Sequence, residues 1–518
     1  MTDRRIGRSL VALTATVALL AGCGGSAVTD AADPASAQVD RAASAADVPP
    51  GATAPGSAPA ATAPATSTAA AATASGSATG GVRTGVATSG AKAGKDKTVA
   101  GAAASSPGNA TSTVEKVVAT APIFGGNGTC KPATLSPVNI GNVSTLSGVL
   151  GELFAPVRSA LETFAASQNA CGGLNGHRIN LYIDDDQGDP ATASSKVQAM
   201  IQTKKVLAFI GNIQLLTVDA VVPIIKKYGI PILGSDLTNN TWFTNPLLFP
   251  QGSSVQSMAY GYVQAALNYF HTPNVGEVWC IEVPRACEQM DRAFKELAPM
   301  MGATVKKTIQ VSITAPSYVQ QCLDLKNAGV EALGLSFDAA SQHRLARSCT
   351  QVGYFPHVMP YPLGVGNEKQ FLQGQKWLGN AYVSMNHFPW FASDTPALKY
   401  WQASVQKFNP GFTSGGTAAM GWASGALLVA ASAGLSAENP TTQQLLDTLW
   451  TFKGQKWTTL GGLTPPLRYQ ENGNPRIPYC LFTAISNADN TGWVKGVSTP
   501  VCTDLVAPSD PQAQPAKP

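Results

Sequence analysis

The sequence predicts an α/β protein built from two tandem units, each with a parallel, doubly wound β-sheet. Two observations carry this prediction. Between residues 138 and 234, short apolar runs alternate with stretches whose apolar residues recur at helical spacing, and the alternation restarts near residue 275. Strict strand–helix–strand order is typical of parallel sheets with right-handed crossovers. Ligands of such sheets lie at the carboxyl ends of the strands, and a cleft between two units is a favoured pocket.

The first unit begins with a strand-like run that ends in a polar turn. The helix expected next has Phe154, Val157, Leu161 and Phe164 at helical spacing and ends at a glycine pair. A second helix is expected to reach about residue 203, and a third ends near residue 228. The expected strands are 138–143, 178–183, 206–211 and 230–234.

The second unit repeats this order over a similar length of chain. The expected strands are 275–281, 308–313 and 332–337, and the expected helices are 287–301, 317–328 and 341–352. The apolar segment 358–365 completes the unit. A repeat of the same pattern predicts a second sheet of the same kind beside the first.

The N-terminus has the composition of an export signal. Three arginines precede a short apolar run at 10–20, which is too short to span a membrane. The run ends in Leu20-Ala-Gly-Cys23, which resembles a bacterial lipobox and predicts a signal peptide over 1–22 and lipidation of Cys23. We therefore expect a lipid anchor on the extracytoplasmic face of the bacterial cell membrane. An ordinary secretory signal is the alternative.

The segments outside the two units have low-complexity composition. Residues 23–130 are rich in Ala, Thr, Ser, Gly and Pro, and too few large apolar residues are present to offset the entropy of ordering. Residues 505–518 are rich in Pro and Ala. The sequence predicts a disordered linker over 23–130 and a disordered tail over 505–518.

Composition and motifs exclude several classes of function. Lys and Arg number 35 against 31 Asp and Glu, so no basic footprint for nucleic acid is evident. The sequence contains no GxSxG, HExxH or Walker-type motif, and its five histidines are scattered, so no enzyme and no cofactor are predicted. We interpret the acidic run 184–186 as a turn that caps the following helix rather than as a metal site.

Apart from Cys23, the chain has eight cysteines. An even number in an oxidising compartment indicates four disulfides, and eight cysteines allow 105 pairings. No CxxC motif or Cys/His cluster accompanies them, which argues against a metal site.

The segment 172–190, with its Gly-Gly-Leu-Asn-Gly start and its Asp-Pro end, resembles the type I periplasmic binding proteins. The leucine/isoleucine/valine-binding branch, which supplies ABC importers, is the most similar. Residues 210–212, 228–232 and 363–367 add to a resemblance that covers about 135–500. It implies two Rossmann-like lobes with parallel doubly wound sheets behind the linker: lobe 1 from 131–252 plus 388–460, and lobe 2 from 253–387 plus 461–504.

The resemblance also implies function and covalent structure. A small polar solute, amino-acid-like or an amide, would be captured between the lobes by hinge closure and delivered to the importer's membrane subunits. A sensor domain acting through another partner is the alternative, and a cell-envelope enzyme is a weaker one. Sequential disulfides are favoured: Cys130–Cys171, Cys280–Cys287, Cys322–Cys349 and Cys480–Cys502.

Family binding positions can be carried over residue by residue. Thr238 matches a ligand-binding threonine of the family, whereas Leu215 falls near its carboxylate-binding serine and Leu363 near its ammonium-binding glutamate. The other candidate ligand contacts are Ser147, Asn212, Gln214, Ser235, Asp236, Phe337, Asp338 and Phe388.

Two of the family's polar anchors are therefore leucines in this chain. Because a buried ammonium group without a carboxylate is costly, this replacement argues against a simple aliphatic amino acid as ligand. Asp236 and Asp338 are the acids available for a cationic or polyhydroxylated ligand.

Overall fold

The computed structural model describes residues 107–148 and 150–513, all of which belong to one compact unit, Thr98–Pro518. The predicted signal peptide, Cys23 and most of the predicted linker lie outside the described residues.

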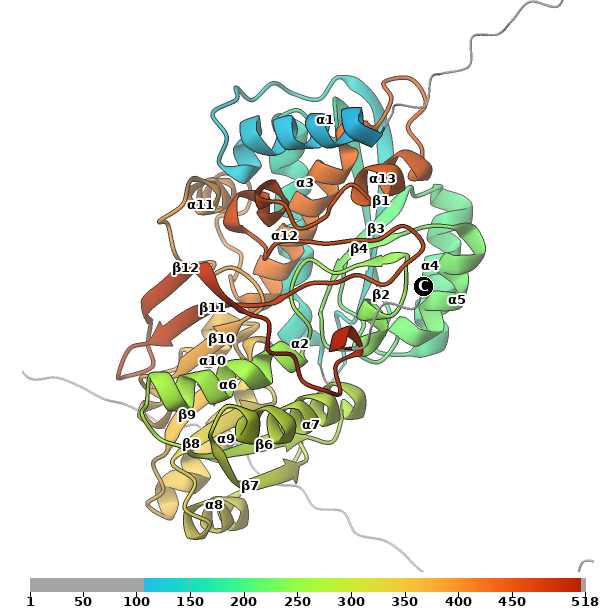
Figure 1. Ribbon diagram of the computed structural model, residues 1–518. Helices are drawn as coiled ribbons and strands as arrows, with labels where there is room; N and C mark the ends of the chain where they lie inside the picture. Colours follow the sequence, from blue (N-terminus) through green and yellow to red (C-terminus); the bar gives the residue numbers. More distant parts are fainter. Residues whose placement is uncertain (1–106, 149, 514–518) are drawn as a thin grey trace, which may run out of the picture. The chain divides into compact units, whose positions relative to one another are not determined.

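The first lobe is built on a parallel five-stranded sheet in the order β2-β1-β3-β4-β5 (Figure 1). Each predicted strand is present within a few residues of its expected bounds. Its strands are β1 (Leu135–Ser144), β2 (His177–Asp185), β3 (Ala208–Asn212), β4 (Ile232–Ser235) and β5 (Leu248–Phe249), and its helices are α2 (Gly151–Phe154), α3 (Pro156–Ala170), α4 (Pro190–Ala199) and α5 (Val218–Tyr228).

The second lobe is built on a parallel four-stranded sheet in the order β7-β6-β8-β9. The edge strand β7 starts four residues before its predicted position, because most of its side chains are exposed or half-buried and give little apolar pattern. The strands are β6 (Asn274–Cys280), β7 (Thr304–Val311), β8 (Ala332–Ser336) and β9 (His357–Pro360), and the helices are α6 (Gln256–Asn268), α7 (Pro284–Met300), α8 (Val319–Asn327) and α9 (Ala339–Gln351). The two parallel sheets confirm the predicted fold class.

A third, antiparallel sheet in the order β10-β11-β12 packs against α6. In this sheet, a strand near residue 384 pairs with the first of two C-terminal strands. Its members are β10 (Tyr382–Met385), β11 (Tyr479–Ser486) and β12 (Trp493–Thr503). The remaining helices are α10 (Glu368–Phe371), α11 (Pro396–Phe408) and α13 (Thr442–Leu449).

Helix α12 (Gly416–Ala431) lies in the core of the first lobe. It packs against α3, β3 and β4, and every residue in it is buried. Within the described part of the chain, Gly416–Gly434 is the one helical stretch long and apolar enough to span a membrane. A helix that is apolar on all sides and enclosed by protein is a core helix.

Four disulfides link the cysteines in the sequential pairs that the family resemblance implied. That prediction is confirmed. Cys280–Cys287 closes a short loop between β6 and α7, whereas the other three pairs join elements further apart in the sequence.

The structure corrects both predicted disordered segments. Helix α1 (Pro107–Thr120) lies within the predicted linker, and its Val114 and Val118 are buried against the first lobe. Valines at helical spacing among small residues were the missed signal. At the other end, Asp510 is buried and accepts hydrogen bonds from Tyr479 Oη at 2.6 Å and Ser254 Oγ at 2.5 Å. The tail prediction is therefore wrong for residues up to 513, because distant partners hold the segment.

Candidate functional site

A small cavity of about 50 Å³ lies where the carboxyl ends of strands from both parallel sheets meet. The first lobe contributes α2 and the loops after β3 and β4, and the second lobe contributes the segments that follow β6, β7, β8 and β9. The lining residues are Leu150, Leu153, Phe154, Leu215, Thr238, Cys280, Val283, Ala286, Cys287, Ile313, Ser336, Phe337, Asp338, Tyr361, Leu363 and Gly364.

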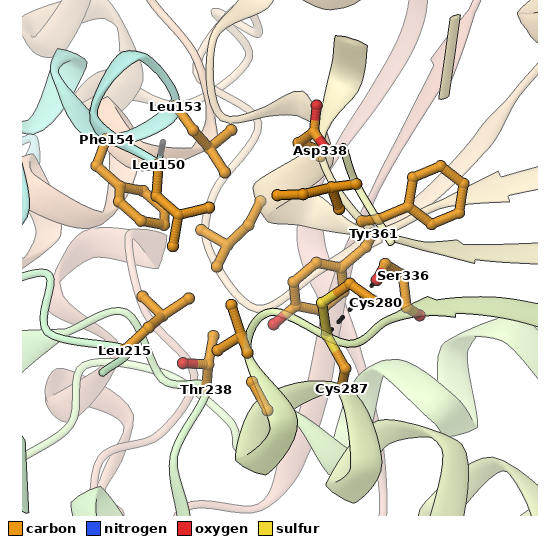
Figure 2. Close-up of a pocket in the computed structure, with 16 residues that line it drawn as sticks. Leu150, Leu153, Phe154, Leu215, Thr238, Cys280, Cys287, Ser336, Asp338 and Tyr361 are labelled. Atoms are coloured by element: carbon orange, nitrogen blue, oxygen red, sulfur yellow. Dashed lines mark hydrogen bonds between the residues drawn. A yellow bond between two sulfur atoms is a disulfide. The ribbon is translucent and has the colours of Figure 1, made fainter. Parts of the chain in front are cut away.

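The lining is mostly apolar, as Figure 2 shows. Aliphatic and aromatic side chains, a glycine and the Cys280–Cys287 disulfide form most of the wall. Polar side-chain atoms come from Thr238, Ser336, Asp338 and Tyr361, and the part of the chain that the structure describes places no Lys, Arg or His on the wall. No cluster of three or more metal-ligating side chains occurs among the described residues.

Five of the predicted binding residues line this cavity: Leu215, Thr238, Phe337, Asp338 and Leu363. Both leucines that replace polar family positions therefore face the cavity. The prediction of a small polar solute does not fit this wall, because burying polar ligand groups against it would leave them without partners.

Asn212, the last residue of β3, and Gln214, in the loop that follows, are both buried and do not line the cavity. The Asn212 amide nitrogen donates to Gln214 Oε1 at 3.3 Å, and its oxygen accepts from the Val143 backbone N–H at 3.4 Å. Gln214 Nε2 has no hydrogen-bond partner among the described residues. These side chains tie β1 to β3 rather than reach the cavity.

Asp236 also lies behind the cavity wall, and it organises the loop after β4. Its carboxylate accepts from the backbone N–H groups of Gln214 at 2.8 Å and Thr238 at 2.9 Å, and from the Thr238 hydroxyl. Between them, Leu237 has φ of 62°, a left-handed conformation that is unfavourable for a bulky side chain. Burial raises the pKa of Asp236, and the Thr238 hydrogen bonds partly offset that rise. Asp236 therefore holds a strained loop.

The remaining predicted residues also have structural partners outside the cavity. Ser147 is exposed and its side chain hydrogen-bonds to Asp185. Ser235 Oγ accepts from the Leu237 N–H at 3.0 Å. Phe388 is fully buried and packs edge-to-face on Trp401, with ring centroids 6.1 Å apart.

Asp338 lines the cavity, but its carboxylate caps helix α9. It accepts from the Ser341 backbone N–H at 3.0 Å and from the Ser341 hydroxyl at 2.5 Å. An aspartate in this position satisfies N–H groups of the first helical turn. Much of its hydrogen-bonding capacity is therefore already used.

Ser336, at the end of β8, was not predicted as a site residue. Its hydroxyl donates to Glu277 Oε1 at 2.6 Å, while Glu277 Oε2 is buried without a partner among the described residues. Burial raises the pKa of Glu277 well above its ordinary value, and nearby Asp291 raises it further. A buried acid therefore stands directly behind the cavity wall of the second lobe.

Tyr361 was also missed, although it follows β9 directly. Its side chain is half-buried and projects into the cavity on the same side as Thr238 (Figure 2). Within the described chain, its hydroxyl makes no hydrogen bond. Burial raises the pKa of Tyr361, and the charge of Asp236 adds to this effect, so the phenol stays protonated.

The apolar residues of α2 and the disulfide loop were missed for a different reason. Leu150, Leu153 and Phe154 form a dense apolar group directly after the first turn, and that density was an available signal. The Cys280–Cys287 bridge places Val283 and Ala286 at the wall, so the pairing implied by the family resemblance was an available signal for these two residues.

Two parallel-sheet lobes with a mostly apolar cavity at their strand ends define a ligand-binding protein of two lobes. Residues 137–488 match the sequence model of the periplasmic binding protein family, and the chain belongs to that family. Membership makes it a binding protein rather than an enzyme, and one that works outside the cytoplasm. A search of curated proteins gave no match.

Solved structures share the fold at low sequence identity. A fatty acid ABC transporter substrate-binding protein from Thermomonospora curvata has a TM-score of 0.61 and 17% identity, and the match covers 73% of this chain and 97% of that one. A solute-binding protein of an ABC transporter from R. palustris, in complex with benzoate, has a TM-score of 0.57 and 15% identity over 72% and 99%. A branched-chain amino acid transporter substrate-binding protein from Streptococcus pneumoniae, in complex with isoleucine, has a TM-score of 0.56 and 14% identity over 71% and 100%.

Proposed function

We propose that this protein is the lipid-anchored solute-binding subunit of an ABC importer and that the cavity described above holds the solute. The observation that supports this most strongly is the origin of the cavity wall, because both lobes contribute to it at the carboxyl ends of their strands. The fold neighbours named for ABC transport are consistent with the same role. Lipidation at Cys23 would keep the captured solute near the membrane subunits.

Capture follows from a wall divided between two lobes. A solute that contacts both walls stabilises the closed arrangement by its difference in affinity for the closed and open forms. We propose lobe 1 as 131–252 plus 388–460 and lobe 2 as 253–387 plus 461–504, with α1 and residues 505–513 packed onto them. The closed form would then bind the membrane subunits.

The test is stabilisation of the protein by solutes, measured as thermal shift on the full chain carrying Cys23→Ser. Amino acids, amides, polyamines, aromatic acids, fatty acids and their alcohols form the panel. A solute at a hundredfold excess over its dissociation constant adds about 2.7 kcal/mol to the free energy of unfolding. Ala286, a buried wall residue at the start of α7, supplies the blocking variant: Ala286→Phe fills the cavity and is expected to abolish the shift.

Val494→Phe is the matched control, because residue 494 is 64% exposed and lies outside the cavity. It adds a similar ring and should keep the full shift. A shift that survives in Ala286→Phe would place the solute elsewhere and contradict the proposed site.

A further inference from the structure

The charges around the cavity select against anions. Among the residues that form its wall, Asp338 is the single ionisable acid, and no basic side chain accompanies it. The cation closest along the chain, Arg285, forms an ion pair with Asp219 and does not line the cavity. A buried carboxylate without a counter-charge is costly, so this wall disfavours carboxylate ligands.

The wall offers little to a cation or a zwitterion either. The Asp338 carboxylate already accepts the N–H and hydroxyl of Ser341 at the start of α9. The positions where the family resemblance places polar anchors for an amino acid are Leu215 and Leu363, and both side chains are buried at the wall. An ammonium group would therefore lose its hydration without gaining a free carboxylate.

The hydroxyl groups on the wall differ in the hydrogen-bonding capacity that remains for a ligand. Thr238 Oγ1 donates its hydrogen to Asp236, and Ser336 Oγ donates its hydrogen to Glu277 at 2.6 Å. Tyr361 Oη has no partner within the part of the chain that the structure describes, and it shares the cavity with Thr238 (Figure 2). Tyr361 thus supplies a free donor, and Thr238 Oγ1 retains lone pairs that can accept.

We propose that the ligand is an uncharged, largely apolar molecule with one hydroxyl or carbonyl oxygen, which accepts a hydrogen bond from Tyr361. This inference rests on the proposed function, since it assigns the ligand class of the same cavity. The apolar body contacts the α2 leucines, Phe337 and the disulfide. A hydroxyl group on the ligand gains a second bond by donating to Thr238.

The experiment compares two matched pairs of probes: benzyl alcohol with benzoate, and 1-octanol with octanoate. Binding is measured by calorimetry at pH 7 on the full chain carrying Cys23→Ser, with leucine as a fifth compound. Each alcohol is expected to bind at least tenfold more tightly than its carboxylate. Tyr361→Phe keeps the ring and removes the donor, so it should weaken alcohol binding by about three- to tenfold.

Tyr400→Phe is the matched control, because Tyr400 Oη bonds to Ser167 Oγ at 3.0 Å outside the cavity. It removes a phenol without touching the wall and should leave alcohol binding within twofold, about the lower limit of a lost hydrogen bond.

Carboxylates that bind as tightly as the alcohols, or leucine that binds more tightly, would overturn the assigned ligand class and leave the proposed function standing, provided that Ala286→Phe abolishes their binding. An alcohol affinity that Tyr361→Phe does not change would overturn the role of Tyr361. If none of the five compounds binds, the ligand class fails, and the proposed function is decided by the wider panel. If Ala286→Phe binds them normally, the proposed site fails together with the ligand class.

Discussion

The two walls of the cavity use their polar residues in opposite ways. In the first lobe, both Asp236 carboxylate oxygens accept hydrogen bonds from the loop around them. In the second lobe, buried Glu277 accepts one hydrogen bond from Ser336. Its other oxygen and the Tyr361 hydroxyl have no partner within residues 107–148 and 150–513. A polar side chain in a cleft loop therefore indicates ligand binding only when its hydrogen-bonding groups are not already satisfied within its own loop.

The largest expected effect is a loss of stability when the loop that Asp236 holds in the first lobe is disrupted. Asp236→Ala removes the acceptor for two backbone N–H groups and one hydroxyl and releases the left-handed Leu237. Loss of buried acceptors should lower the free energy of unfolding by about 3 kcal/mol, measured by urea denaturation. Asp236→Asn retains one acceptor oxygen and should lose less. Equal losses in the two variants would contradict the assigned role of the carboxylate.

A similar contrast separates the features that could be predicted from the sequence from those that could not. The strands β3 and β4 were predictable because a buried apolar run is a local property. Leu215, Thr238, Phe337, Asp338 and Leu363 line the cavity, and the family resemblance was the basis for placing them at the site.

The role of Asp236 and the freedom of Tyr361 were not predictable in the same way. Each depends on which atoms of distant segments approach it, and Asp510 in the C-terminal segment is a further case, because its partners are Ser254 and Tyr479. A single sequence does not record such pairings.

The next effect concerns the disulfide in the second wall. Cys280→Ala with Cys287→Ala opens a loop of sequence separation 7, and about 2–3 kcal/mol of stability should be lost. Because Val283 and Ala286 lie on that loop, 1-octanol affinity should fall as well. The control is Cys322→Ala with Cys349→Ala, which opens a loop of separation 27 away from the cavity. That variant should lose at least as much stability and keep its affinity for 1-octanol. If instead the control loses affinity and the Cys280/Cys287 variant keeps it, the disulfide loop does not contribute to binding.

The third effect is a pH dependence of the second wall. The pKa of Glu277 is raised by burial above its ordinary 4.5, so the folded state holds this proton more tightly than the unfolded state does. Its contribution to stability is therefore complete below pH 4.5 and declines as the pH rises toward the folded pKa, by about 1.4 kcal/mol per pH unit. Glu277→Gln should reduce this decline, as measured by urea denaturation between pH 4.5 and 8, and buried Asp236, whose pKa is also raised, should keep its own contribution to it.

Glu331 provides the opposite case for the same measurement. It is exposed, and hydrogen bonds from Thr272 and Asn274 lower its pKa, so its contribution is lost as the pH falls. Glu331→Gln should leave the decline above pH 4.5 in place. A decline of unchanged size in Glu277→Gln would assign the pH dependence to the other buried carboxyl groups, Asp186, Asp236 and Glu368.

The smallest effect tests the single acid on the wall. Asp338→Asn keeps an effective cap on α9, because asparagine and aspartate cap helices about equally well, and stability should change by less than about 0.5 kcal/mol. The substitution removes a negative charge from the cavity, which should raise octanoate affinity relative to 1-octanol by about two- to fivefold at low salt. Calorimetry with both probes gives this ratio directly. An unchanged ratio would mean that Ser341 and the N-terminus of α9 already neutralise Asp338, and the discrimination against carboxylates would then rest on the lack of a cation alone.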